Sequence, residues 1–166
     1  ENALELGINF FDTADTYGEG YGEEVLAKFM GHRRNEIIIA TKFGYDFYDK
    51  SVPRVGHQER PQKFEKEFIK FACEQSLRRL NTDRIDLYQL HSPRPAHPIE
   101  QTMANLLKLR DDGKIRYIGV SNFSGEQHAE AAQFGPINSS QPRYNMLYRS
   151  PEESVLPTCL ELGIGV

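Results

Sequence analysis

Several features that define whole functional classes are scarce in this sequence or missing from it. Only two of the 166 residues are cysteines, Cys73 and Cys159, and they lie far apart within apolar helical patterns. This favours two small buried side chains over a disulfide or a zinc site, so a reducing, cytoplasmic compartment is expected. No apolar run approaches the ~20 residues of a membrane-spanning helix, and no basic segment followed by an apolar one opens the chain. Membrane insertion and export are therefore not expected.

Charge of one sign is not concentrated anywhere either. The net charge of -4 comes from interspersed acidic and basic residues, so the basic surface that nucleic acids bind is missing and no such partner is expected. The chain also lacks a nucleophile elbow, a His-Glu-x-x-His motif and any close cluster with metal-ligand spacing, so no metal is expected. Four histidines in polar contexts are expected to be solvated: His32, His57, His97 and His128.

What the sequence does contain is a regular alternation of strand and helix patterns. Its 39% hydrophobic and 27% charged content is ordinary for one globular domain, here residues 1–166. Short apolar runs predict strands at residues 9–11, 37–41, 85–90, 117–120 and 138–141. Helical spacing of apolar residues predicts helices at residues 23–30, 64–80, 99–109, 125–134 and 152–162. Such alternation predicts an α/β fold with a parallel sheet.

Polar residues at the strand ends distinguish between the two main parallel folds, a doubly wound open sheet and a β/α barrel. An open sheet concentrates such groups near one switch point, whereas a barrel gathers every strand end into one ring. Here they fall at or just past the carboxyl ends of five successive strands: Asp12, Lys42, His91, Ser121 with Asn122, and Gln141. The sequence therefore predicts a (β/α)8 TIM barrel.

Tyr17, which follows Asp12 by five residues, is the candidate general acid. An isolated phenol has a pKa of about 10 and is a poor proton donor at neutral pH, so it needs a positive neighbour. Lys42 on the adjacent strand is expected to supply that charge, with Asp12 holding the lysine protonated. His91 is expected to hydrogen-bond a substrate oxygen and share the proton delivery. Each residue alone also has a structural explanation, and Asp15 is interpreted as an ordinary turn residue.

Two further segments are candidate binding loops. The glycine-rich residues 18–23 superficially resemble a phosphate-binding loop, but Glu23 stands where a third glycine is needed and the glutamates would repel a pyrophosphate. A turn entering a helix is expected there. Residues 45–61 form a long loop whose Tyr45, Phe47 and Tyr48 either wall a substrate pocket or anchor the loop to the barrel rim.

Five segments together resemble the aldo-keto reductase family: GINFFDTA at residues 7–14, ATKFG at 40–44, DLYQLH at 86–91, GKIRYIGVSNF at 113–123 and QPRYN at 141–145. The resemblance implies a barrel that reduces carbonyls of small molecules with a nicotinamide cofactor, usually NADPH, with NADH as the alternative. It implies that the catalytic tetrad is Asp12, Tyr17, Lys42 and His91, with Tyr17 as the proton donor. It further implies that the nicotinamide carboxamide is held by Ser121, Asn122 and Gln141, because hydroxyl and amide groups supply both donors and acceptors.

The chain departs from the resemblance in length. The first strand, the completion of the seventh and the whole eighth are absent, so an incomplete barrel of about strands 2 to 6 and the start of strand 7 is expected. Absent with them are the aromatic residue that stacks on the nicotinamide and the basic residues that bind the adenosine phosphate. An open barrel exposes sheet edges, which favours self-association. Two other functions stay open: a non-enzymatic, cofactor-sensing subunit resembling potassium-channel β-subunits, and an inactive barrel fragment.

Overall fold

The structure is a computed structural model that describes residues 2–51, 60–94 and 96–166. Within these residues one sheet contains the strands β1 (Phe10–Asp12), β2 (Ile38–Phe43), β3 (Ile85–Leu90), β4 (Ile115–Ser121) and β5 (Ser139–Gln141). The helices are α1 (Asn2–Glu5), α2 (Tyr21–Met30), α3 (Lys66–Leu80), α4 (Ile99–Asp111), α5 (Gly125–Ala132) and α6 (Val155–Leu162), with short 3-10 helices η1 (Arg34–Glu36) and η2 (Ser150–Glu152). In the described part of the chain, no helix is both long and apolar enough to cross a membrane.

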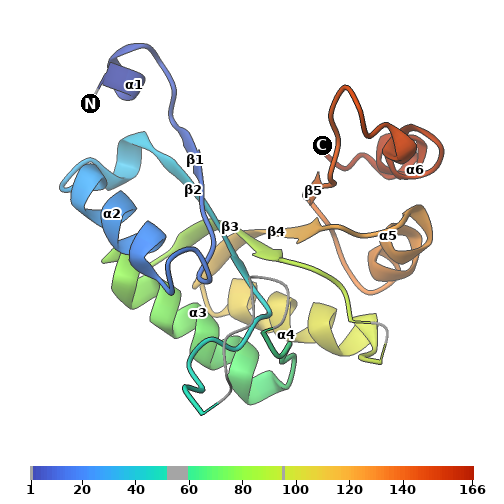
Figure 1. Cartoon of the computed structure of the whole chain (residues 1–166), viewed down its shortest axis with the longest axis horizontal. Coiled ribbons are helices and arrows are strands. Elements are labelled where there is room, and N and C mark those ends of the chain that lie inside the picture. The colour runs from blue at the N-terminus through green and yellow to red at the C-terminus, as the bar shows by residue number, and fades with distance from the viewer. Residues whose placement is uncertain (1, 52–59, 95) are drawn as a thin grey trace.

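The order of the strands confirms the barrel and excludes the doubly wound sheet. Every strand pairs in parallel with the next strand along the chain, from β1 to β5, whereas a doubly wound sheet reverses its order at a switch point. Figure 1 shows that helices α2 to α6 follow the outer side of the curved sheet. After α6 the chain begins one more strand, because Gly165 pairs in parallel with Ser139. The fold is an incomplete TIM barrel of five strands and the start of the next.

The two faces of the sheet have different surroundings, because successive side chains of a strand point to opposite faces. On the helix side the sheet is covered, and Phe43 stacks on Tyr88 with ring centroids 4.6 Å apart. On the other face Phe10, Ile38 and Tyr117 are 49%, 40% and 55% exposed. The inner face of the described sheet thus exposes apolar side chains.

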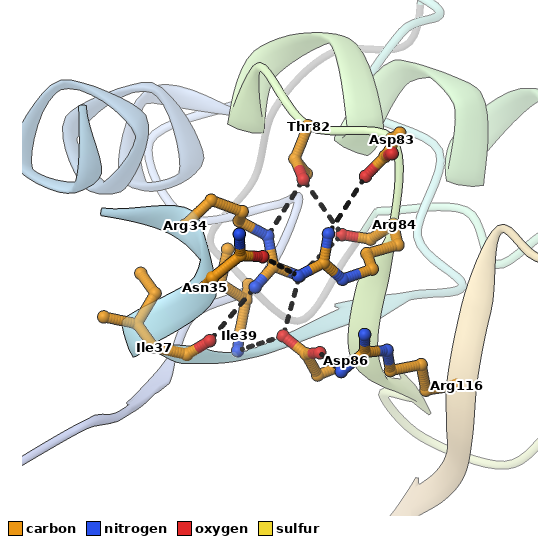
Figure 2. Close-up of polar contacts among 9 residues, drawn as sticks. All are labelled: Arg34, Asn35, Ile37, Ile39, Thr82, Asp83, Arg84, Asp86 and Arg116. Carbon is orange, nitrogen blue, oxygen red and sulfur yellow. Dashed lines mark hydrogen bonds and ion pairs between the residues drawn. The ribbon is translucent and has the colours of Figure 1, made fainter. Parts of the chain in front are cut away.

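The amino-terminal ends of β2, β3 and β4 are joined by a buried ionic network (Figure 2). The Asp86 carboxylate accepts a hydrogen bond from the Ile39 N–H at 3.0 Å and pairs with Arg34 at 2.7 Å. Its other oxygen pairs with Arg116 at 3.2 Å, and Arg34 also donates to the main-chain carbonyl of Arg84 at 2.9 Å. Charged groups at this end of barrel strands serve stability, because the reactive groups of β/α barrels lie at the carboxyl ends.

His128 is not solvated, so that prediction was wrong. Its ring is fully buried, with Nδ1 2.7 Å from the carbonyl of Ser124 and Nε2 2.8 Å from the hydroxyl of Ser140. Burial lowers the pKa of this histidine, which joins α5 to β5 as a neutral hydrogen-bonding group. Of the other three histidines, His32 is exposed as predicted, His97 is partly buried with its ring stacked on Phe64, and His57 lies outside the described residues.

Candidate active site

The carboxyl ends of β1 and β2 bring Asp12 and Lys42 together. Lys42 Nζ donates to Asp12 Oδ2 at 2.6 Å and to the main-chain carbonyl of Thr13 at 2.9 Å. The Lys42 side chain is only 2% exposed. A buried ammonium group requires an opposite charge and hydrogen-bond acceptors, and these two contacts provide both. Lys42 is therefore a fixed charge at the floor of the strand-end site.

Gln89 belongs to the same arrangement, although it was not among the residues predicted from the sequence. It is the β3 partner of Lys42 in the strand register, and its Nε2 donates to Asp12 Oδ1 at 3.1 Å. The available signal was strand alternation, which places Gln89 on the same face as His91 two residues later. Both oxygens of the Asp12 carboxylate are thus occupied, so its orientation toward Lys42 is fixed.

Tyr17 lies above these residues on the turn between β1 and α2. Lys42 Nζ is 5.3 Å from the centroid of the Tyr17 ring, and the His91 ring meets Tyr17 edge to face at 5.9 Å. Tyr45 contacts His91 from another direction, with ring centroids 5.2 Å apart. The Tyr17 side chain is 45% exposed, so it is accessible to a small molecule. The structure therefore brings the four predicted catalytic residues into one site.

His91 is electrostatically unusual. Burial and then the positive charge of Lys42 lower the pKa of His91 to about 4, with Asp12 opposing the shift. Its Nδ1 is buried and has no hydrogen-bond partner among the described residues. The imidazole is therefore neutral at neutral pH and has one ring nitrogen that donates and one that accepts.

The predicted cofactor-binding residues connect the ends of β3, β4 and β5. Asn122 has a left-handed backbone with φ of 61°, and its Nδ2 donates to the carbonyl of His91 at 3.0 Å. The Ser121 hydroxyl donates to the main-chain carbonyl of Gln141 at 2.9 Å, and the Gln141 side chain is exposed. A cleft of about 480 Å³ opens beside Asn122, with Pro142, Arg143, Tyr148 and Ser154 among its lining residues.

The turn that carries Tyr17 contains a buried carboxyl group, so Asp15 is not the ordinary turn residue that was predicted. Asp15 is fully buried, and its carboxyl oxygens have no partner with normal hydrogen-bond geometry among the described residues. Burial raises the pKa of Asp15 well above its usual range, and the nearby Glu23 raises it further, while Arg79 and the Thr16 N–H offset part of the shift. Burial therefore favours the protonated form of Asp15 compared with an exposed aspartate.

The glycine-rich segment, residues 18–23, is a turn that leads into α2, as predicted, and its Glu23 side chain points into the protein interior. Glu23 is fully buried, accepts a hydrogen bond from the Thr41 hydroxyl at 2.7 Å and pairs with Arg79 at 2.6 Å. The carboxylate is thus part of the protein interior. The described contacts of this segment support a structural role for Glu23.

The structure also separates the two explanations offered for the aromatic residues of the long loop. Phe47 is buried and stacks on Tyr48 with centroids 4.1 Å apart, and Tyr48 contacts Phe71 of α3 at 4.8 Å. These two side chains anchor the loop to the barrel. Tyr45 contacts His91, so it is the one of the three that borders the strand-end site.

The chain forms part of a β/α barrel, and its polar groups gather at the carboxyl ends of the parallel strands. Barrel enzymes place their active sites at these ends. The family model described as the aldo/keto reductase family matches residues 1–166, and the chain belongs to this family. It is 44% identical over 157 residues to the aldo-keto reductase YhdN of Bacillus subtilis, covering 93% of this chain and 45% of that protein.

Solved structures agree with this assignment. The glycerol dehydrogenase AKR11B4 from Gluconobacter oxydans is 36% identical with a TM-score of 0.87, over 98% of this chain and 49% of that one. The holo form of the aldo-keto reductase AKR11C1 from Bacillus halodurans is 40% identical with a TM-score of 0.86, over 98% of this chain and 52% of that one. The chain thus spans about half the length of these relatives.

Proposed function

We propose that this protein reduces aldehydes or ketones to alcohols, with NADPH or NADH as the hydride donor. The observation that carries the proposal is the convergence of the Tyr17 phenol, the Lys42 ammonium and the neutral His91 imidazole at adjacent strand ends. One group can donate a proton, the second can stabilise the anion left behind, and the third can bind an oxygen. The two buried free cysteines support the reducing cytoplasm as its compartment.

The ends of β4 and β5 fit the carboxamide of a nicotinamide cofactor. Asn122 directs its NH2 group to the His91 carbonyl, which leaves its side-chain oxygen as an acceptor. Gln141 adds an exposed amide with both a donor and an acceptor. The cleft of about 480 Å³ beside Asn122 provides space for an organic ligand. When bound, the cofactor would supply the hydride, and these residues would orient its carboxamide.

The chain's own residues supply the other half of the reduction. Tyr17 would donate its phenolic proton to the carbonyl oxygen, and Lys42 would stabilise the resulting phenolate through its positive charge. Asp12 and the Thr13 carbonyl keep that ammonium in place. His91, being neutral, would donate a ring N–H to the same oxygen and orient the substrate. One proton and one hydride complete the alcohol, and solvent then restores the Tyr17 proton.

The assay should include two kinds of carbonyl. 4-Nitrobenzaldehyde is an activated aromatic aldehyde that tests the chemistry with few demands on the pocket. Glyceraldehyde and dihydroxyacetone are included because one structural relative is a glycerol dehydrogenase. Activity toward glyceraldehyde and dihydroxyacetone but not toward 4-nitrobenzaldehyde would indicate a preference for short polyol-derived substrates.

Replacing Tyr17 by Phe in the protein at its natural full length tests the proposal. Loss of the general acid should lower kcat about 10²- to 10⁴-fold, with the KM for the cofactor unchanged. Tyr21→Phe is the matched control, because Tyr21 is an exposed tyrosine at the start of α2. Oxidation of NADPH and NADH is followed by absorbance. Absence of turnover in the wild type, or equal rates in the two variants, would refute the proposal.

A further inference from the structure

A buried polar cluster lies beneath the turn that carries Tyr17, and the proposed reaction does not use it. We call it the Arg79 cluster, and its members are Asp15, Glu23, Thr41, Tyr48 and Arg79. These residues come from the turn, α2, β2, the loop after β2, and α3. A buried polar network constrains the segments that it joins where its members are hydrogen-bonded, as Glu23, Thr41, Tyr48 and Arg79 are; Asp15 lies nearby without such a bond among the described residues.

Arg79 of α3 makes most of the contacts that hold the cluster together. Its Nε donates to Glu23 Oε2 at 2.6 Å, and both terminal nitrogens donate to the Tyr48 hydroxyl at 3.1 Å. A weaker contact joins it to the Ser76 hydroxyl at 3.4 Å. The guanidinium carbon of Arg79 also lies 5.5 Å from the ring centroid of Phe47 and 5.7 Å from that of Tyr48. Arg79 thus connects α3 to α2 and to the loop after β2.

The same arginine packs directly against the turn. Gly20 has a left-handed backbone with φ of 95°, and a Cβ atom built on it would lie 2.4 Å from Arg79 Cδ. The aliphatic part of Arg79 therefore occupies the space beside the Gly20 backbone. Any side chain at position 20 would displace Arg79 or the turn.

Backbone hydrogen bonds to β2 fix only the first part of the turn that carries Tyr17. The Thr13 and Asp15 N–H groups bond to the carbonyls of Ala40 and Lys42, but the next backbone bonds, from Tyr17 to Ala14 and from Glu19 to Thr16, remain inside the turn. Left-handed residues at Gly18, Glu19 and Gly20 follow Tyr17 directly. Outside the Arg79 cluster, Arg60 donates to the Thr16 carbonyl at 3.3 Å, and the Glu19 carboxylate of the turn pairs with Arg60 at 3.4 Å and with the exposed Lys50 at 3.0 Å. The backbone that follows Asp15 is thus held mainly by side-chain contacts, and the buried ones come from the Arg79 cluster beneath the turn.

Glu23 connects this support to the strand that carries Lys42. Its Oε1 accepts a hydrogen bond from the Thr41 hydroxyl, and Thr41 is the residue immediately before Lys42 on β2. Neighbouring residues of a strand face opposite sides of the sheet. Glu23 and Arg79 thus hold the turn against β2 from the helix side, while Lys42 faces Asp12 on the inner side.

We propose that Arg79 is a positioning residue for Tyr17: through Glu23, Tyr48 and the Gly20 backbone it holds the phenol in register with Lys42 and His91. The inference rests on the proposed function. Arg79 lies on α3, on the helix side of the sheet, with its side chain only 13% exposed, so we expect its effect on the reaction to pass through the turn. Displacing a reacting group by about 1 Å can lower a rate by about 100-fold.

The test compares Arg79→Met with Arg78→Met in the protein at its natural full length. Arg78 is the exposed neighbour on the same helix, so the control removes a charge and no buried contact. We expect kcat for carbonyl reduction to fall about 100-fold in Arg79→Met, with the cofactor KM within about twofold of the control. Arg79→Lys keeps the charge but loses the forked geometry, and it should recover part of kcat. If Arg79→Met does not fold, Arg79→Lys carries the comparison.

A double-mutant cycle with Tyr17→Phe separates positioning from general loosening. If Arg79 acts by placing Tyr17, then Arg79→Met should cause little further loss when the phenol is already absent. Losses that multiply would overturn the inference, as would equal kcat values in Arg79→Met and Arg78→Met.

Amide hydrogen exchange of residues 13–22 provides a second measurement that does not depend on activity. We expect faster exchange in Arg79→Met than in Arg78→Met. If the wild-type protein has no reductase activity, the proposed function fails by itself. The exchange rates then decide whether Arg79 holds the turn, and equal rates would refute that part as well.

Discussion

Removing the Asp86 carboxylate should destabilise the protein and leave its chemistry intact. Asp86 lies at the amino-terminal end of β3, where it accepts the Ile39 N–H and pairs with Arg34 and Arg116 (Figure 2). The candidate active site lies at the opposite end of the same strands. Asp86→Ala therefore separates stability from catalysis within one sheet.

The expected magnitude follows from the burial of the partners. The side chains of Asp86 and Arg34 are 5% and 13% exposed, so Asp86→Ala leaves a buried guanidinium without its counter-charge. Removal of one member of a buried pair costs about 3–5 kcal/mol. Arg116 is 55% exposed, and an exposed pair adds at most about 1 kcal/mol. For a domain whose unfolding free energy is about 5–15 kcal/mol, this is a large fraction of the total.

Thermal and urea unfolding of the protein at its natural full length measure this effect. A loss of about 3–5 kcal/mol corresponds to a fall in Tm of about 6–20 °C for a domain of about 150–250 residues, and to a smaller fall for a larger one. Asp86→Asn keeps an acceptor for the Ile39 N–H and should fall between wild type and Asp86→Ala. Asp83→Asn is the control, because its side chain is 86% exposed. The reasoning would be refuted if Asp86→Ala lost no more stability than Asp83→Asn. It would also be refuted if Asp86→Ala changed kcat at temperatures well below its Tm.

Two further predictions concern the inner face of the barrel. The pKa of His91 is about 4 in the folded protein, below its unfolded value, so the free energy of unfolding should fall as the pH drops through about 6.5. His91→Gln should reduce the stability lost between about pH 7 and pH 5 by about 1 kcal/mol after solvent screening, as measured by urea unfolding. The exposed control His32→Gln should leave that loss unchanged. A Cβ at Gly119 would lie 2.7 Å from Gln89 Cγ, so Gly119→Ala should cost about 1–3 kcal/mol and lower kcat by displacing Gln89 from Asp12. Adding Gln89→Ala should restore Tm but not kcat, and an unchanged Tm in Gly119→Ala would contradict this account.

Most of the fold could be predicted because its signals are local. The β-branched run at residues 37–41 predicts a strand buried on both faces, and the observed strand covers Ile38–Phe43. Its burial was predicted correctly except at Ile38, which is 40% exposed on the inner face. His91 directly follows β3, whose predicted bounds are those observed. Parallel strands with single connecting helices bring their carboxyl ends to one edge of the sheet, so residues far apart in sequence could be expected to meet there.

The interactions that the sequence did not reveal are long-range pairs between side chains. From the local sequence alone, Arg79 is a favourable positive charge near the end of α3, and Glu23 is an ordinary acidic residue in the first turn of α2. Their pairing depends on how two helices pack on the sheet, which a single sequence does not specify. Gln89 was overlooked for a related reason, because its role depends on its register with Lys42.

Strand alternation explains why these hidden pairs bear on the proposed chemistry. Thr41 and Lys42 are consecutive residues whose side chains face opposite sides of β2. The first bonds to Glu23 and through it to Arg79 on the helix side, whereas the second pairs with Asp12 on the inner side. Because α2 begins directly after the Tyr17 turn, the short backbone segment between Tyr17 and Glu23 connects the candidate active site to the helix layer. A change in the helix packing at Glu23 should therefore alter the distance between Tyr17 and Lys42, whereas a change at Asp86 should not.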